Sequence, residues 1–186
     1  MKIETSSVLK VRLTDLGKNR SPIDVILEDH KPHHGEIFIK CDGDSWTYYW
    51  GAMGGMDNPK TIQEFFCSCD YSYLMGKLTR VSSTIHDFEK LEENLKNTII
   101  KQRMSWDLDR AEARDLWDDV EWCHFRDYED INLISNEASR ILTKLIGDEW
   151  WYDIPEKTNP EYQYIRKIVE TVKEGLLKLS ENLAPV

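Results

Sequence analysis

The N-terminal third of the chain alternates apolar and polar positions with the two-residue period of β-strands. Four segments rich in β-branched and aromatic residues are separated by turn signals: Val8–Leu13, Ile23–Leu27, Ile37–Lys40 and Trp46–Trp50. Asp42-Gly43 falls between the last two segments and suits a two-residue hairpin turn. We therefore predict an N-terminal antiparallel four-stranded sheet.

After residue 60 the apolar positions recur every three or four residues, which is the period of amphipathic helices. Thr61 and Glu64 form a capping-box pattern that predicts the start of a helix through Cys69, followed by a continuation or second short helix up to residue 78. The Trp-rich segment 148–160 is expected to be a packed loop. Longer helices are predicted over residues 85–103, 107–125 and 129–146 and from Pro160 onward.

Length and composition place the chain among folded globular proteins. It has 186 residues, of which 40% are hydrophobic and 31% charged, which disfavours disordered, collagen-like and low-complexity classes. No internal repeat and no Ser- or Gly-rich linker marks a domain boundary. We expect a single α+β domain over residues 1–186, with the sheet and its covering helix in 1–80 and a mostly helical C-terminal half in 81–186.

Cysteine usage and hydropathy indicate the compartment. Four cysteines are few and scattered, which is typical of reduced thiols: Cys41, Cys67, Cys69 and Cys123. No stretch has the roughly 20 apolar residues of a membrane span, and the N-terminal MKIETSSVLK lacks the apolar core of a signal peptide. We expect a cytoplasmic protein with no membrane association.

The excess negative charge is concentrated in one short segment. The chain carries 24 basic and 34 acidic residues, a net charge of −10, and residues 105–130 alone contribute −7. Direct nucleic-acid binding is not expected, because affinity for phosphates comes largely from Lys and Arg. A basic protein partner is favoured instead.

Spaced carboxylates on the outer face of a helix can imitate a phosphate backbone and attract the basic groove of a nucleic-acid-binding protein. The alternative is a solvated helix face whose acids are partly paired with Arg110, Arg114 and Arg126. Exposed Trp or Tyr side chains would supply apolar anchors beside the charges. The candidate protein-binding residues are Asp107, Asp109, Glu112, Asp115, Asp118, Asp119, Glu121, Asp127, Glu129 and Asp130.

Two Trp-rich blocks carry a resemblance to a known group of proteins. The first is WTYYWGAMG at residues 46–54 with FFCSCD at 65–70 and Tyr73-Leu74, and the second is GDEWWY at 147–152 with NPEY at 159–162. Together they resemble a family of small accessory proteins of tailed bacteriophages and enterobacterial prophages. The resemblance implies expression in an infected bacterial cytoplasm, and it carries over no reaction and no site residue.

The sequence gives little support for metal binding or catalysis. Cys67 and Cys69 are too close in sequence for a usual structural zinc pair, and the His30, His33 and His34 loop is typical of a polar turn. No nucleophile sits in a recognisable catalytic motif. We therefore assign no catalytic residue, cofactor or metal ligand, and a non-enzymatic role is favoured.

These patterns lead to one functional hypothesis and two alternatives. By analogy with other small phage accessory proteins, the chain is expected to inhibit a host defence complex, of anti-CRISPR or anti-restriction type, by stoichiometric binding that competes with nucleic acid. The alternatives are a small metal-dependent enzyme and a phage structural or assembly protein. The sequence leaves the target and any homo-oligomer open.

Overall fold

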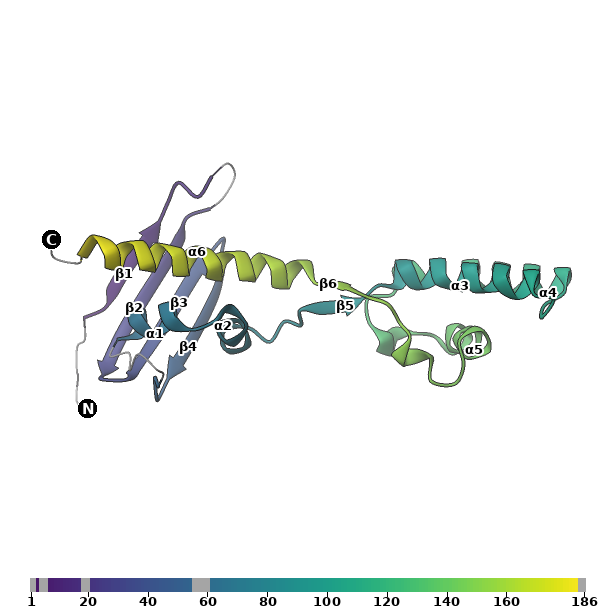
Figure 1. Cartoon of the computed structure of the whole chain (residues 1–186), viewed down its shortest axis with the longest axis horizontal. Coiled ribbons are helices and arrows are strands. Elements are labelled where there is room, and N and C mark those ends of the chain that lie inside the picture. The colour runs from purple at the N-terminus through teal and green to yellow at the C-terminus, as the bar shows by residue number, and fades with distance from the viewer. Residues whose placement is uncertain (1–2, 4–6, 18–20, 55–60, 184–186) are drawn as a thin grey trace. The chain divides into compact units, whose positions relative to one another are not determined.

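The structure, a computed structural model, describes residues 3, 7–17, 21–54 and 61–183. The chain divides into two compact units, the first containing Met1–Val81 and Pro160–Val186 and the second Ser82–Asn159 (Figure 1). The second unit is therefore an insertion between two segments of the first. The last helix packs on the sheet, so the unit that contains the sheet combines residues from both ends of the chain.

The N-terminal sheet contains the four predicted strands in chain order, each antiparallel to the next. They are β1 (Leu9–Leu13), β2 (Ile23–Lys31), β3 (His34–Cys41) and β4 (Asp44–Trp50). Asp42 and Gly43 have φ angles of 51° and 93°, so this turn has the positive φ values that a tight two-residue hairpin requires. The sequence prediction of an N-terminal four-stranded antiparallel sheet followed by a mostly helical half is thus confirmed.

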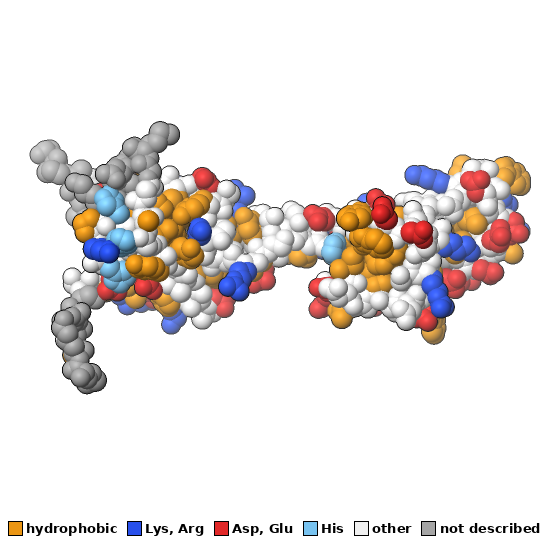
Figure 2. All heavy atoms as spheres, turned by 90° about the horizontal axis from the view of Figure 1, so that it is seen from below, with side chains coloured by type: hydrophobic (Ala, Val, Ile, Leu, Met, Phe, Trp, Pro, Cys, Tyr) orange, Lys and Arg blue, Asp and Glu red, His pale blue; other side chains and the backbone are white. Residues whose placement is uncertain are grey.

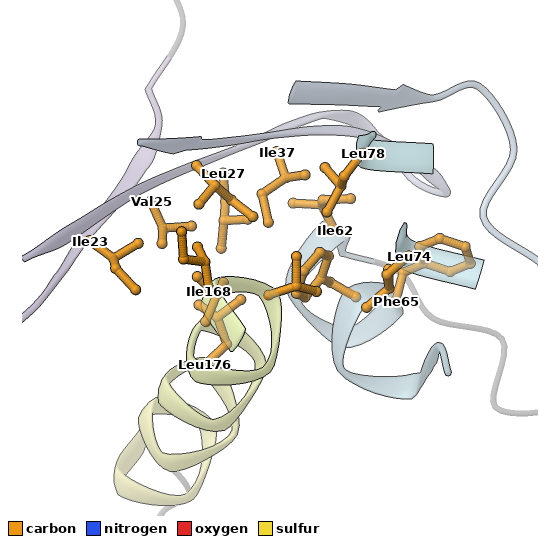
Figure 3. Packing of buried hydrophobic residues seen from close by; sticks show 14 of the residues in the cluster. Ile23, Val25, Leu27, Ile37, Ile62, Phe65, Leu74, Leu78, Ile168 and Leu176 are labelled. Carbon is orange, nitrogen blue, oxygen red and sulfur yellow. The ribbon is translucent and has the colours of Figure 1, made fainter. Parts of the chain in front are cut away.

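Among the described residues, three helices cover one face of this sheet, where the sequence predicted one. They are α1 (Ile62–Ser68), α2 (Tyr71–Leu78) and α6 (Pro160–Leu183). Alternate residues of β2 and β3 are buried and point toward the helices. Apolar side chains of α1 and α6, such as Ile62, Ile168 and Leu176, pack against them (Figure 3). The predicted capping box is present, since Thr61 Oγ1 accepts from Glu64 N and the Glu64 carboxylate accepts from Thr61 N.

The second unit begins and ends with a short strand pair that the sequence pattern did not predict. Strand β5 (Thr84–His86) is antiparallel to β6 (Glu156–Thr158). Consequently α3 begins at Phe88, three residues later than predicted. Asp87 caps it, because its side chain accepts from Lys90 N at 3.1 Å.

Three α-helices form the core of the second unit. They are α3 (Phe88–Met104), α4 (Arg110–Trp122) and α5 (Asn136–Leu145). The 3-10 helices η1 (Phe125–Asp127) and η2 (Ile131–Leu133) lie between α4 and α5, and η3 (Trp150–Tyr152) follows α5. The predicted helix 129–146 is split, because Ser135 caps a new helix by accepting from Ala138 N. Each helix contributes buried side chains to this core, among them Leu95 of α3, Leu116 of α4 and Leu142 of α5.

Candidate protein-binding surface

All ten acidic residues singled out from the sequence are exposed in the structure. Asp107 and Asp109 precede α4, five of the acids lie on it, and Asp127, Glu129 and Asp130 follow it in and after η1. We call residues 107–130 the acidic segment. The structure therefore brings the predicted site residues together on one element and its two flanking loops.

Half of these carboxylates have a local structural role. Asp109 Oδ1 accepts from the backbone N of Ala111 and Glu112 at 2.7 and 2.9 Å, and Glu112 Oε2 accepts from Asp109 N at 2.8 Å. This capping box fixes the start of α4, and negative charge there is favourable to the helix dipole. Asp107, Glu121 and Asp130 also accept hydrogen bonds from neighbouring groups.

The other five carboxylates have no hydrogen bond or ion pair of their side chains within the described residues: Asp115, Asp118, Asp119, Asp127 and Glu129. On a helix with about 100° between successive residues, positions 115, 119 and 122 fall within roughly 60° of one another. We call Asp115, Asp119 and Trp122 the acidic flank of α4. Arg110 and Arg114 project from the opposite flank.

The arginines expected to neutralise this surface do not pair with it. Arg126 binds Glu92 of α3, and Arg110 and Arg114 form no ion pair within the described part of the chain. Charge on the acidic flank is thus balanced by solvent rather than by these side chains. The pairing with these three arginines that the solvated-face alternative expected is therefore absent among the described residues.

Two tryptophans near α4 are almost fully exposed, Trp106 in the loop before it and Trp122 at its last residue. Trp106 is 83% and Trp122 is 81% exposed, although tryptophan is among the more strongly buried residue types. The Trp106 ring lies 5.2 Å from the Arg103 guanidinium, whereas Trp122 lies on the acidic flank. Figure 2 shows exposed apolar side chains next to acidic ones on the visible face of the second unit.

The sequence analysis did not single out these two tryptophans. Trp50 and Trp150, which belong to the two Trp-rich blocks of the sequence, are both buried. A signal was present, because neither Trp106 nor Trp122 falls on the apolar stripe of a predicted helix. Large aromatic side chains outside such a stripe, within an acidic stretch, are candidates for contact with a partner.

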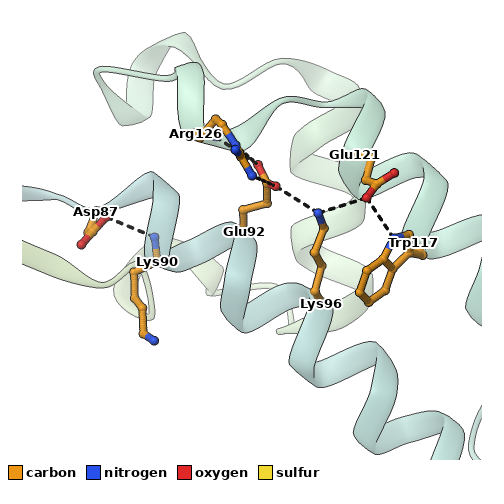
Figure 4. A network of polar contacts seen from close by, with 7 residues as sticks. All are labelled: Asp87, Lys90, Glu92, Lys96, Trp117, Glu121 and Arg126. Carbon is orange, nitrogen blue, oxygen red and sulfur yellow. Dashed lines mark hydrogen bonds and ion pairs between the residues drawn. The ribbon is translucent and has the colours of Figure 1, made fainter.

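A buried charge network holds α4 against α3 (Figure 4). Glu92 is 4% exposed and its Oε1 accepts from Arg126 Nη2 at 2.7 Å and from Lys96 Nζ at 3.2 Å. Lys96 also donates to Glu121 Oε1, which accepts from Trp117 Nε1 at 3.0 Å. The hydrogen bonds from Arg126 lower the pKa of Glu92 to about 2. Sequence analysis missed this carboxylate, which is conspicuous as an acid within the apolar stripe of α3.

The remaining candidate groups are dispersed. His30 lies in β2 between Glu28 and Glu36, at 3.7 and 3.8 Å, and His33 has a φ of 64° in the β2–β3 turn. Among the described residues, no group of three or more His, Cys, Asp or Glu side chains could hold a metal ion.

All four cysteines are free. Burial raises the pKa of each thiol, which disfavours the thiolate form. Cys41 is the most buried, and its sulfur lies 3.9 Å from the Tyr164 hydroxyl.

No helix in the described ranges has the length and apolarity to cross a bilayer. Comparison with curated proteins gives no match, and comparison with solved structures gives none. A sequence model of a phage family, Phage_phiTE_072, matches residues 1–178. Because this match spans most of the chain, the protein belongs to that phage family.

Proposed function

We propose that this protein is a phage-encoded inhibitor that binds a host defence complex in the bacterial cytoplasm and blocks its nucleic-acid channel with the acidic segment. One observation carries the proposal: carboxylates without intramolecular partners share a helix flank with an exposed tryptophan. The family assignment supports the phage context. An origin in enterobacterial prophages and an anti-CRISPR or anti-restriction target are finer parts of the same proposal.

The physical roles of the two residue types differ. Asp115 and Asp119 are one helical turn apart, about 6 Å along the axis, and their negative charge would speed encounter with a channel lined by Lys and Arg. Trp122 would contribute lasting affinity, because desolvated aromatic side chains dominate many interfaces. The mechanism is steric competition with nucleic acid, and it requires no reaction.

A tagged full-length protein tests this proposal in a pull-down from phage-infected bacterial lysate at low and high salt. The informative variant is Asp115→Lys with Asp119→Lys, which reverses the acidic flank and leaves the capping box intact. A matched control is Glu174→Lys with Glu181→Lys. Both control residues are exposed on α6 of the other unit, and the change in net charge is the same.

The proposal predicts that wild type and control recover a nucleic-acid-binding complex at low salt, that high salt releases it, and that the flank variant recovers much less. If the flank variant recovered as much of the complex as wild type, the acidic flank would not be the binding surface. Recovery of virion components in place of a nucleic-acid-binding complex would favour an assembly role and contradict the inhibitor proposal.

A further inference from the structure

An open groove of about 470 Å³ lies between α3 and α4, on the side away from the acidic flank. Its apolar lining includes Ile99, Ile100 and Met104 of α3, and the Met104 side chain is 76% exposed. A groove with such exposed apolar side chains on a highly charged unit is a candidate contact surface.

The charges that α4 presents to this groove are ordered along the helix. Arg110 and Arg114 come first, and Asp118 and Glu121 follow after Trp117. Arg110, Arg114 and Asp118 have no ion pair within the described residues, and only Oε1 of Glu121 is engaged. The groove-facing stripe is thus positive at its N-terminal end and negative at its C-terminal end.

Such a stripe is complementary to itself when two copies run antiparallel. Positions 110 and 121 and positions 114 and 118 share almost the same midpoint, near residue 116. A twofold axis at that point would set Arg110 against Glu121 of the second copy and Arg114 against Asp118, with both pairs formed twice. This is the isologous arrangement of symmetric dimers, in which the same patch is used on both copies.

We propose that the α3–α4 groove is the interface of a homodimer in which two α4 helices pack antiparallel. A partner of a single charge sign would leave one half of the stripe opposed by like charge, whereas a second copy satisfies both halves. Ile100 and Met104 of each copy supply the apolar contact. The acidic flank lies outside the groove, so the dimer presents two acidic flanks, whereas Asp118 and Glu121 of the acidic segment lie in the interface. The inference rests on the groove and not on the proposed function.

Sedimentation velocity of the full-length protein tests the inference over about 1 to 100 µM at physiological ionic strength. The variants are Arg114→Asp, Asp118→Arg and the double exchange of both. We expect a dimer for wild type, a dissociation constant at least about tenfold higher for each single variant, and recovery of the dimer in the double exchange. Asp115→Lys with Asp119→Lys should stay dimeric, which separates this interface from the acidic flank.

A wild type that sediments as a monomer throughout this range would overturn the proposal and leave the groove to another occupant. Single variants with the wild-type dissociation constant, or a double exchange that stays monomeric, would overturn the antiparallel pairing. Met104→Ala provides a second route if a charge variant fails to fold, because truncation of this exposed side chain leaves the core intact and should still weaken the dimer.

Discussion

Arg126 Nη2 donates to the buried Oε1 of Glu92 at 2.7 Å, and this bond connects the turn after α4 to the N-terminal part of α3. A second bond from Arg126 Nε reaches Glu92 Oε2 at 3.3 Å. A carboxylate that is 4% exposed is stable in its charged form only with such partners. This ion pair, the Lys96–Glu121 contact and the buried side chains of α4 together hold the acidic segment against α3.

Stability should depend on Glu92 in a pH-dependent way. Its pKa of about 2 in the folded protein lies below the usual 4.5, so its contribution is fully present above pH 4.5 and is lost as pH falls toward 2. Near neutral pH, Glu92→Gln should lower the free energy of unfolding by about 3 kcal/mol. Chemical denaturation at pH 7, 4 and 2.5 should show that the difference in unfolding free energy between wild type and Glu92→Gln becomes smaller as pH falls.

Glu93→Gln is the control for that series. Glu93 is adjacent in sequence, and its side chain pairs with Lys90 at the exposed surface of α3. Its substitution should change the unfolding free energy by no more than about 0.5 kcal/mol at any pH. An equal pH dependence of wild type and Glu92→Gln would contradict the assignment of the lowered pKa to this network.

Two tryptophans of the second unit should differ in their contribution to stability. Trp122→Ala should leave the free energy of unfolding within about 0.5 kcal/mol of wild type, because the side chain packs on almost nothing. Trp150 is 9% exposed, and Trp150→Ala should lower the free energy of unfolding by about 3 to 5 kcal/mol. Thermal unfolding measures both, and a large loss of stability in Trp122→Ala would show that this side chain has a structural contact.

Two glycines of the first unit should respond in opposite directions to alanine. A Cβ at Gly35 in β3 would lie 2.7 Å from Ile62 Cβ and 3.1 Å from the Glu28 carbonyl oxygen, so Gly35→Ala should destabilise the fold by about 1 to 3 kcal/mol. No described atom lies within 4 Å of such a Cβ at Gly76 in α2, where alanine should stabilise the helix by about 0.5 to 1 kcal/mol. Denaturant midpoints of both variants check the signs, and a Gly35→Ala variant as stable as wild type would contradict the close packing of α1 on β3.

The strands of the sheet could be predicted because one face is buried and the other is not. Val25 and Leu27 alternate with partly exposed residues, and this period is visible in the sequence. Strands β5 and β6 have three residues each, none of them buried, and pair across a long stretch of chain. No local pattern marks such a pairing, which is why the start of α3 was predicted too early.

An apolar stripe shows that a helix buries one face, but it does not show what covers that face. Val169 and Val172 of α6 predicted an amphipathic helix, and only the structure places it on the sheet rather than in the helical half. The exposure of the acidic segment likewise followed from its pattern. The pairing of Arg126 with Glu92, which leaves the acids of α4 unpaired with that arginine, depends on tertiary contacts between distant segments.

The most direct test of the central claim is nucleic-acid binding by the captured host complex, measured by fluorescence anisotropy with and without this protein. The account predicts that wild type displaces the nucleic acid stoichiometrically, that Asp115→Lys with Asp119→Lys does so much less, and that Glu174→Lys with Glu181→Lys behaves as wild type. A host complex that carries the bound protein and still retains its full affinity for nucleic acid would contradict the account.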